Sequence, residues 1–134
     1  MNVLLDSNAY VALFKGHEGV ARRVRTAEQV FLSSVVTGEL LFGFRYGARY
    51  DANRRQLDAF LANPYVSFLP VGLATADRFG RIAAALRRKG TPLPTNDIWI
   101  AAHAMESGAD LLSFDRHFGK VEGLAWVDPS DANQ

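Results

Sequence analysis

The sequence predicts an α/β fold in which a central parallel sheet of four or five strands lies between layers of helices. Two observations predict it. Short apolar runs alternate along the chain with stretches of helical periodicity, and 134 residues with 49% hydrophobic and 22% charged side chains suit one globular domain. Strands that alternate with helices pair in parallel through right-handed crossovers, which puts helices on both faces of the sheet. We expect one domain over residues 1–127 and a flexible tail over the polar residues 128–134.

The first half of the chain carries three predicted strands and four predicted helices. The strands are short apolar runs at 2–5, 30–33 and 66–69, which suit buried parallel strands. Helical stretches are predicted at 8–14, 18–27, 37–50 and 51–62. The last of these ends at Asn63-Pro64, because a proline disfavours the helical conformation in the residue before it.

The second half of the chain continues the alternation. A long helix is predicted at 74–89, with Phe79, Ile82 and Leu86 on one stripe and Gly90 as its stop. The segment 91–94 contains two prolines and is expected to form a rigid loop. A further helix at 97–107 ends before Gly108, a fourth strand is predicted at 110–113, and a fifth near 124–127.

The composition excludes several classes of protein. The chain has no cysteine, so a disulfide framework, a zinc-finger cluster and a cysteine nucleophile are ruled out, and a reducing cytosol is favoured. No apolar run approaches the roughly 18 residues that a membrane span needs. The start of the sequence reaches Asp6 without a basic stretch, which is unlike a signal peptide. We therefore expect a cytoplasmic protein.

The net charge of +1 conceals an asymmetry along the chain. Residues 1–96 carry 13 Lys and Arg against 7 Asp and Glu, whereas residues 97–134 carry 2 against 7. Twelve of the 15 basic residues are arginine, which binds phosphate with a planar fork of donors. The basic residues are either the solvated faces of helices or a surface for a polyanion, such as nucleic acid or an acidic protein segment.

Four acidic residues occur in apolar surroundings near the predicted carboxyl ends of strands. Asp6 directly follows the first strand, and Asp115 lies just beyond the fourth. Glu39 lies early in the helix after the second strand, and Asp97 opens the helix before the fourth. In open parallel sheets, ligands bind beyond the carboxyl ends of the strands. We therefore expect the four carboxylates to share one site.

Each of these acids also has a purely local explanation. Asp6 can cap the short helix that follows it, and Asp115 can start a turn. Asp97 suits the first turn of a helix, where the dipole favours a negative charge, and Glu39 can be a surface residue of its helix. The local roles do not explain why all four acids fall near the same end of the predicted sheet.

Four neighbouring carboxylates need compensation for their mutual repulsion. Two charges ~4 Å apart repel by about 1 kcal/mol in bulk water and about 4 kcal/mol near a protein surface. A divalent cation would offset this repulsion, and oxygen ligands without cysteine favour the hard ions Mg²⁺ or Mn²⁺. Such ions activate water and neutralise charge on a phosphodiester. The combination of acidic residues with a basic surface therefore suggests hydrolysis of nucleic acid.

The motifs around these acids resemble those of the PIN-domain ribonucleases, and most closely the VapC-type toxins of bacterial type II toxin–antitoxin pairs. The resemblance runs in order from residue 3 to about 127. Its motifs are Leu4-Leu5-Asp6-Ser7-Asn8, the Glu39 segment with Gly43, Pro92-Leu93-Pro94-Thr95-Asn96-Asp97-Ile98-Trp99-Ile100-Ala101-Ala102, and Leu111-Leu112-Ser113-Phe114-Asp115-Arg116-His117-Phe118. Each motif is short, but the ordered set of four is fairly specific.

The resemblance implies a PIN-like three-layer sandwich and a Mg²⁺- or Mn²⁺-dependent endoribonuclease that holds one or two ions. It implies an RNA substrate, a homodimer, and inhibition by a VapB-type antitoxin. By motif position, the acidic catalytic and metal-binding set is Asp6, Glu39, Asp97 and Asp115. Ser7 and Ser113 would orient water or the carboxylates, and Asn8 would support them.

Other functions are weaker interpretations. A phosphatase of the haloacid dehalogenase type needs a second Asp two residues after the first, where this chain has Asn8. A non-catalytic module that binds nucleic acid or protein would use the basic helices and would not depend on the acids. A housekeeping RNA-processing nuclease of the same fold usually carries extra domains, for which this chain has no room.

Several histidines and aromatic residues lie close to the four acids in the sequence. His103 is expected to be structural or exposed, whereas His117 lies close enough in sequence to Asp115 to contact substrate or metal. Phe42, Phe44, Tyr46 and Tyr50 follow Glu39 and cover more than one face of their predicted helix. Two of these rings are expected in the core, and any that remain exposed would form a partner surface.

Overall fold

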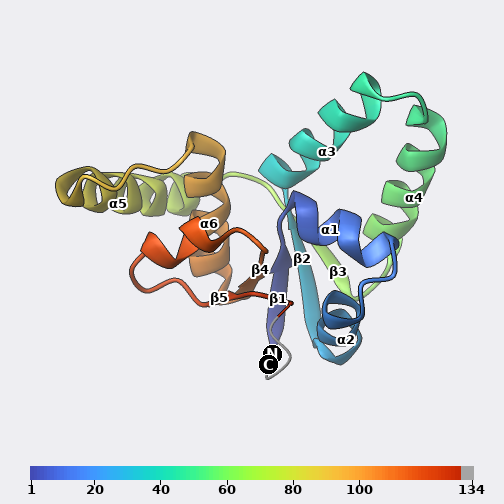
Figure 1. Ribbon diagram of the computed structural model, residues 1–134, viewed down its shortest axis with the longest axis horizontal. Helices are drawn as coiled ribbons and strands as arrows, with labels where there is room; N and C mark the ends of the chain where they lie inside the picture. The colour runs from blue at the N-terminus through green and yellow to red at the C-terminus, as the bar shows by residue number, and fades with distance from the viewer. Residues whose placement is uncertain (131–134) are drawn as a thin grey trace.

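The computed structural model describes residues 1–130 and shows a parallel five-stranded sheet with helices on both faces (Figure 1). The elements along the chain are β1 (Asn2–Leu5), α1 (Ser7–Phe14), α2 (Glu18–Thr26), β2 (Gln29–Ser33), α3 (Ser34–Tyr46), α4 (Tyr50–Ala62), β3 (Val66–Leu69), α5 (Leu73–Lys89), α6 (Thr95–Ser107), β4 (Asp110–Leu112), the 3₁₀-helix η1 (Arg116–Lys120) and β5 (Trp126–Val127). This architecture confirms the predicted α/β class and sheet.

The strand order β3-β2-β1-β4-β5 places β1 at the centre of the sheet, with parallel neighbours on both sides. Leu5 pairs in register with Leu112. Asp6 and Ser113, which follow these two residues, therefore leave the sheet side by side at its carboxyl edge. The register of the two central strands thus fixes the first part of the candidate site.

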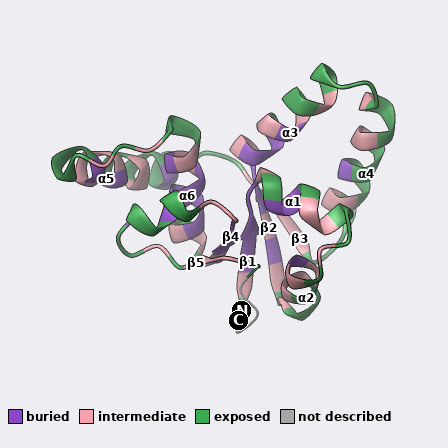
Figure 2. Ribbon diagram, viewed as in Figure 1, coloured by how far each residue is buried: buried purple, intermediate pink, exposed green. Residues whose placement is uncertain are grey.

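The core has two layers because successive residues of a strand point to opposite faces. Val3, Leu5 and Val30 pack with residues of α1 and α2 on one face. Leu4 and Leu32 belong to a larger cluster on the other face, to which α3, α4, α5 and α6 contribute. Figure 2 shows buried residues concentrated in the strands and in α6, whereas the far ends of α3 and α5 are exposed.

Two pairs of helices extend from the sheet in different directions. In Figure 1, α3 rises away from the strands and α4 returns beside it, while α5 lies on the opposite side of the molecule, next to α6. The predicted stop at Gly90 is confirmed, since this residue ends α5 with a left-handed φ of 71°. Gly108 ends α6 in the same conformation, with φ 67°.

Some local predictions were wrong, and the helix predicted to reach residue 50 ends at Tyr46. Helix α3 begins at Ser34 rather than Thr37, because the Ser33 hydroxyl accepts the Val35 N–H and caps the helix despite its β-branched start. Helix α6 begins at Thr95 rather than Asp97. The 3₁₀-helix η1 was not predicted, and it begins where the Asp115 side chain accepts the His117 N–H.

The start of the predicted tail packs against the domain. Pro129 is buried, and its carbonyl oxygen lies so close to Gly19 in α2 that a Cβ there would overlap it. The Asp128 carboxylate accepts hydrogen bonds from the amide and hydroxyl of Ser130. Residues 131–134 lie outside the described residues. None of the helices within residues 1–130 has the length and apolar character that a membrane crossing needs.

Candidate active site

Asp6 lies at the carboxyl edge of the sheet and is held by two hydrogen bonds. It follows β1 and is only 7% exposed. Its Oδ1 accepts the Ala9 N–H at 2.9 Å, which caps α1. Its Oδ2 accepts the hydroxyl of Ser113, a fully buried residue directly after β4, at 2.5 Å. The predicted cap is therefore real, but it uses only one of the two carboxylate oxygens.

Glu39 comes from α3 but is oriented by residues beside two of the other acids. Its Oε1 accepts the Ser7 hydroxyl at 2.5 Å, and its Oε2 accepts the Asn96 side-chain amide at 3.2 Å. Ser7 follows Asp6 in the sequence, and Asn96 precedes Asp97. Three distant segments therefore meet at Glu39, which is not an isolated surface residue.

Asp115 is joined to the same network through Ser113. The backbone N–H of Asp115 donates to the Ser113 hydroxyl oxygen at 3.0 Å, and this hydroxyl in turn donates to Asp6. The Oδ1 of Asp115 accepts the His117 N–H at 2.9 Å and lies 2.8 Å from the His117 Nδ1. Asp115 thus caps η1 and pairs with a histidine at the rim of the site.

Asp97 is the acid with the fewest local contacts. It is the third residue of α6 and partly buried, and within residues 1–130 its side chain accepts no hydrogen bond. Burial is the largest cause that raises the pKa of Asp97 to about 6, and the negative charges of Asp115, Glu39 and Asp6 contribute to the rise, against a lowering by His117. The other three acids are therefore close enough to Asp97 to repel its charge.

Asp6 experiences the same environment. Burial raises its pKa, hydrogen bonds from Ser113 and Ala9 oppose the rise, and the charges of Glu39 and Asp115 add to it. The pKa values of Asp6 and Asp97 are thus both raised in part by the charges of the other acids. Capping and the helix dipole alone would not place the acids close enough for this effect. We call Asp6, Glu39, Asp97 and Asp115 the acidic site.

The chemistry of the acidic site fits a hard divalent cation. It offers only carboxylate oxygens, and a cation would relieve the burial and repulsion that raise two of the pKa values. The side chains are not gathered around a single point, however. Within residues 1–130, no three His, Asp or Glu side chains form a ready-made ligand set. Binding of an ion would therefore require these side chains to turn toward it.

The remaining residues weighed from the sequence fall into different places. Asn8 is exposed in the first turn of α1, with no hydrogen bond to the acids among the described residues. His103 is structural: its Nδ1 lies 2.7 Å from the Ser33 hydroxyl and its Nε2 lies 3.2 Å from the Pro70 carbonyl. Because Nε2 must donate to that carbonyl, Nδ1 accepts from Ser33 in the neutral ring. Asn96 was missed by the sequence reasoning, although its place beside Asp97 was a usable signal.

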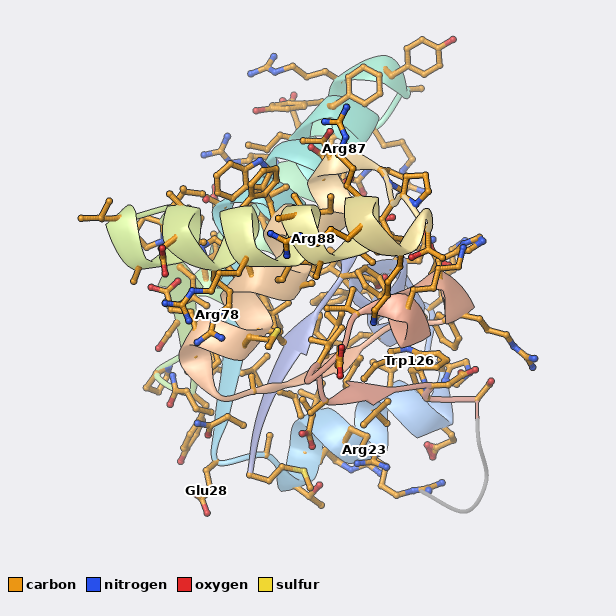
Figure 3. All side chains as sticks on the ribbon, turned by 90° about the vertical axis from the view of Figure 1, so that its left-hand side faces the viewer. Arg23, Glu28, Arg78, Arg87, Arg88 and Trp126 are labelled. Atoms are coloured by element: carbon orange, nitrogen blue, oxygen red, sulfur yellow. The ribbon has the colours of Figure 1, made fainter. Side chains whose placement is uncertain are left out.

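The arginines of α5 are separate from the acidic site. A hollow of about 270 Å³ lies between α5, α6 and η1, lined by Arg78, Arg81, Lys89 and Lys120 around an apolar floor, and none of the four acids lines it. Figure 3 looks onto this side of the molecule, where Arg78, Arg87 and Arg88 extend from α5. The basic and acidic groups thus occupy different surfaces.

Comparison with known proteins yields consistent matches over nearly the whole chain. A family profile described as PIN domain matches residues 3–124. The chain is similar to the ribonuclease VapC2 of Haemophilus influenzae, with 30% identity over 95% of this chain and 99% of that protein. It is also similar to the tRNA(fMet)-specific endonuclease VapC of Shigella flexneri, with 28% identity over 96% of this chain and 98% of that protein.

A solved structure matches as well. The structure of VapBC-1 from nontypeable Haemophilus influenzae matches this fold with a TM-score of 0.86 and 26% identity, covering 98% of this chain and 100% of the other. This chain is thus similar to these proteins in length and, for the solved structure, in fold.

Proposed function

Because the chain belongs to the PIN-domain family, we propose that its acidic site hydrolyses RNA phosphodiester bonds with one or two Mg²⁺ or Mn²⁺ ions. The chain is a VapC-type endoribonuclease, the toxin of a VapBC toxin–antitoxin pair. One observation carries the assignment of the site: four carboxylates from distant segments share one end of the sheet and repel one another. The four are Asp6, Glu39, Asp97 and Asp115.

In this proposal the four carboxylates hold the ion, directly or through water. When bound, it supplies an activated water and neutralises charge on the phosphate. Ser113 fixes one oxygen of Asp6, and Ser7 and Asn96 fix the two oxygens of Glu39. These hydrogen bonds fix the orientation of the Asp6 and Glu39 carboxylates, and Asn8 is exposed in the first turn of α1, two residues after Asp6.

The protonation of Asp97 matters for this role. With a pKa of about 6, its carboxyl loses most of its charge below that pH. Only the ionised carboxylate can act as a ligand, so uptake of the ion must displace the proton from Asp97. Cleavage would therefore fall as the pH drops through 6.

The partners of the chain follow from its membership of a VapBC pair. A VapB-type antitoxin is its inhibitory partner, and RNA is its substrate. We further propose that the chain forms a homodimer and acts in the cytoplasm, where its RNA substrates are. The domain is proposed to span residues 1–127.

Cleavage of RNA tests the assignment of the site. Wild type, Asp97→Asn and Asp77→Asn would be incubated with a panel of cellular RNAs in Mg²⁺, Mn²⁺ or a chelator. We expect cleavage by wild type in either metal and none in chelator or with Asp97→Asn. Asp77→Asn is the matched control, because Asp77 pairs with Arg81 on the exposed side of α5. Cleavage that persists in chelator, or with Asp97→Asn, would contradict the proposal.

Thermal unfolding tests the ion without reference to activity. At saturation, Mn²⁺ binds only the folded protein and should raise the melting temperature by about 5–10 °C over sodium chloride of equal ionic strength. Asp97→Asn should show a smaller shift, since it lacks one ligand. An unchanged melting temperature in millimolar Mn²⁺ would mean that the acids do not hold the ion.

Growth of a bacterial host tests the toxin role. Expression of wild type should arrest growth, and co-expression of its VapB-type antitoxin should restore growth. Asp97→Asn should not arrest growth. A host that grows normally while it makes active wild type would favour a housekeeping nuclease.

A further inference from the structure

Two aromatic rings lie on the face of α3 that also carries Glu39. Phe42 and Tyr46 follow Glu39 by three and seven residues. At about 100° per residue, they lie within roughly 60° and 20° of Glu39 around the helix. Along the axis, Tyr46 is about 10 Å beyond Glu39. The helix that brings an acid to the site therefore carries a line of aromatic rings away from it.

These rings are among the most exposed large side chains of the described residues. Phe42 is 71% exposed and Tyr46 is 87% exposed. They stack on each other, with ring centroids 6.1 Å apart and planes inclined by 22°. Gly43 lies between them on an open surface, where a Cβ would meet nothing within 4 Å. One face of each ring is therefore turned toward the other ring, and the rest of both side chains is largely exposed.

The other aromatic residues of this region have structural contacts. Phe44 packs against the main core cluster. The Tyr50 ring lies under the Arg45 guanidinium at 4.2 Å, and its hydroxyl accepts from Arg45 and Arg54. Of the two rings expected in the core, the structure therefore places Phe44 against it, whereas Tyr50 instead contacts two arginines. Phe42 and Tyr46 are the pair left without such a role.

The surroundings of the two rings are basic. Residues 42–58 carry four arginines, Arg45, Arg49, Arg54 and Arg55, against Asp51 and Asp58, and Arg54 pairs with Asp58. Flat aromatic faces next to arginines are the means by which proteins bind single-stranded nucleic acid, because bases stack on the rings and the cations attract the backbone.

We propose that Phe42 and Tyr46 stack bases of single-stranded RNA that lie next to the phosphodiester held at the acidic site. This inference rests on the proposed function, since RNA must reach Glu39 to be cleaved. A length of about 10 Å along α3 matches about three stacked nucleotides at ~3.4 Å each. The enzyme would then cut in an unpaired segment, because bases paired in a duplex cannot stack on these rings.

Leucine substitutions separate stacking from simple apolar contact. Phe42→Leu and Tyr46→Leu keep a large apolar side chain but remove the aromatic face, whereas Tyr46→Phe keeps the face and serves as the rescue variant. Tyr65→Leu is the matched control, since Tyr65 is 65% exposed and lies before β3, outside α3. We expect KM for an unpaired RNA to rise at least about fivefold per lost ring, with kcat within about twofold.

A binding assay makes the test independent of cleavage. Single-stranded RNA with 2-aminopurine at each position in turn would be added to wild type in chelator. Stacking on the rings should quench 2-aminopurine fluorescence at two or three adjacent positions, and the double leucine variant should lose this quenching. Quenching in a chain that cleaves no RNA would uphold the inference while the proposed function fails.

Three outcomes would overturn the inference. The first is an unchanged KM and unchanged quenching in the double leucine variant. The second is a molar mass of the double leucine variant, measured by light scattering, that is half that of wild type. This would assign the two rings to the contact with a second copy of the chain. The third is normal cleavage with lost inhibition by the antitoxin, which would assign them to that protein.

Discussion

The acidic site and helix α5 both concentrate like charges, but they do so in different ways. The four acids come from the ends of β1 and β4 and from α3 and α6, and they are partly buried. The basic residues of α5 follow one another along a single helix. Of these, Arg81 pairs with Asp77, and Lys89 pairs with Glu122, all with exposed side chains.

The difference between these two regions shows which cluster of like charges indicates a catalytic or ion-binding site. Charges spread along one exposed helix are screened by water, so the sequence can carry them at little cost. Burial, together with the charges that distant segments bring near, raises the pKa of Asp97 and Asp6. A fold that accepts this repulsion gains something from it, which we take to be the binding of an ion.

The largest effect is expected at Asp6, where a cap and a ligand can be told apart. Asparagine caps a helix as well as aspartate does. Asp6→Asn should therefore keep the melting temperature within about 3 °C of wild type, while cleavage falls about a thousandfold, or ~4 kcal/mol. The measurements are thermal unfolding and initial rates in Mn²⁺. If the Asp6→Asn variant still cleaves RNA, Asp6 serves only as the N-cap of α1. The difference drawn between the acidic site and α5 would then not hold for Asp6.

Asn96 should show the next largest effect. Asn96→Ala removes the donor that orients one oxygen of Glu39. Loss of such a supporting contact typically costs about 10- to 100-fold in metal affinity or activity. Titration with Mn²⁺ and kcat at saturating metal would measure it. Asn8→Ala is the comparison, and a smaller loss is expected there because Asn8 is exposed. Equal losses at both positions would contradict the role of the contact.

The repulsion at Asp97 should appear as a pH dependence of stability in chelator. Because the folded-state pKa is raised to about 6 from 3.8, the folded chain holds the proton more tightly between these values. Its contribution to the free energy of unfolding is therefore lost as the pH rises through 6. At pH 8, Asp97→Asn should be more stable than wild type by about 1 kcal/mol, after allowance for solvent screening. Urea unfolding at pH 4 and pH 8 would measure it, and equal stabilities at pH 8 would contradict it.

The smallest effects are expected on α5. Arg87→Ala and Arg88→Ala each remove one exposed charge. If this helix contacts RNA phosphates, each should weaken RNA binding by about twofold to fivefold for all sequences and lower the salt slope by about one. Fluorescence anisotropy at several salt concentrations would measure it. An unchanged salt dependence of RNA binding would mean that the arginines of α5 only face solvent. In that case the acidic site, and not α5, would be the charged region with a function.

The sequence predicted the parts of the fold that depend on local pattern. Alternating apolar runs and helical stretches were enough for the sheet, and the strand-end positions of Asp6 and Asp115 pointed to its carboxyl edge. The contact between Asn96 and Glu39 could not be predicted, because it joins residues 57 positions apart and depends on how α3 and α6 pack. The early start of α3 was also missed, since β-branched residues after Ser33 favour a strand and a single side-chain cap reverses that preference.

The contact between Gly19 and Pro129 has a consequence for the last described turn of the chain. Because only a hydrogen atom fits between α2 and the Pro129 carbonyl, any side chain at position 19 would push residues 128–130 off the domain. Gly19 in α2 therefore allows residues 128–130 to pack against the domain. An alanine at position 19 would be expected to expose residues 128–130 to an endoprotease, with no change at the sheet edge where the acids lie.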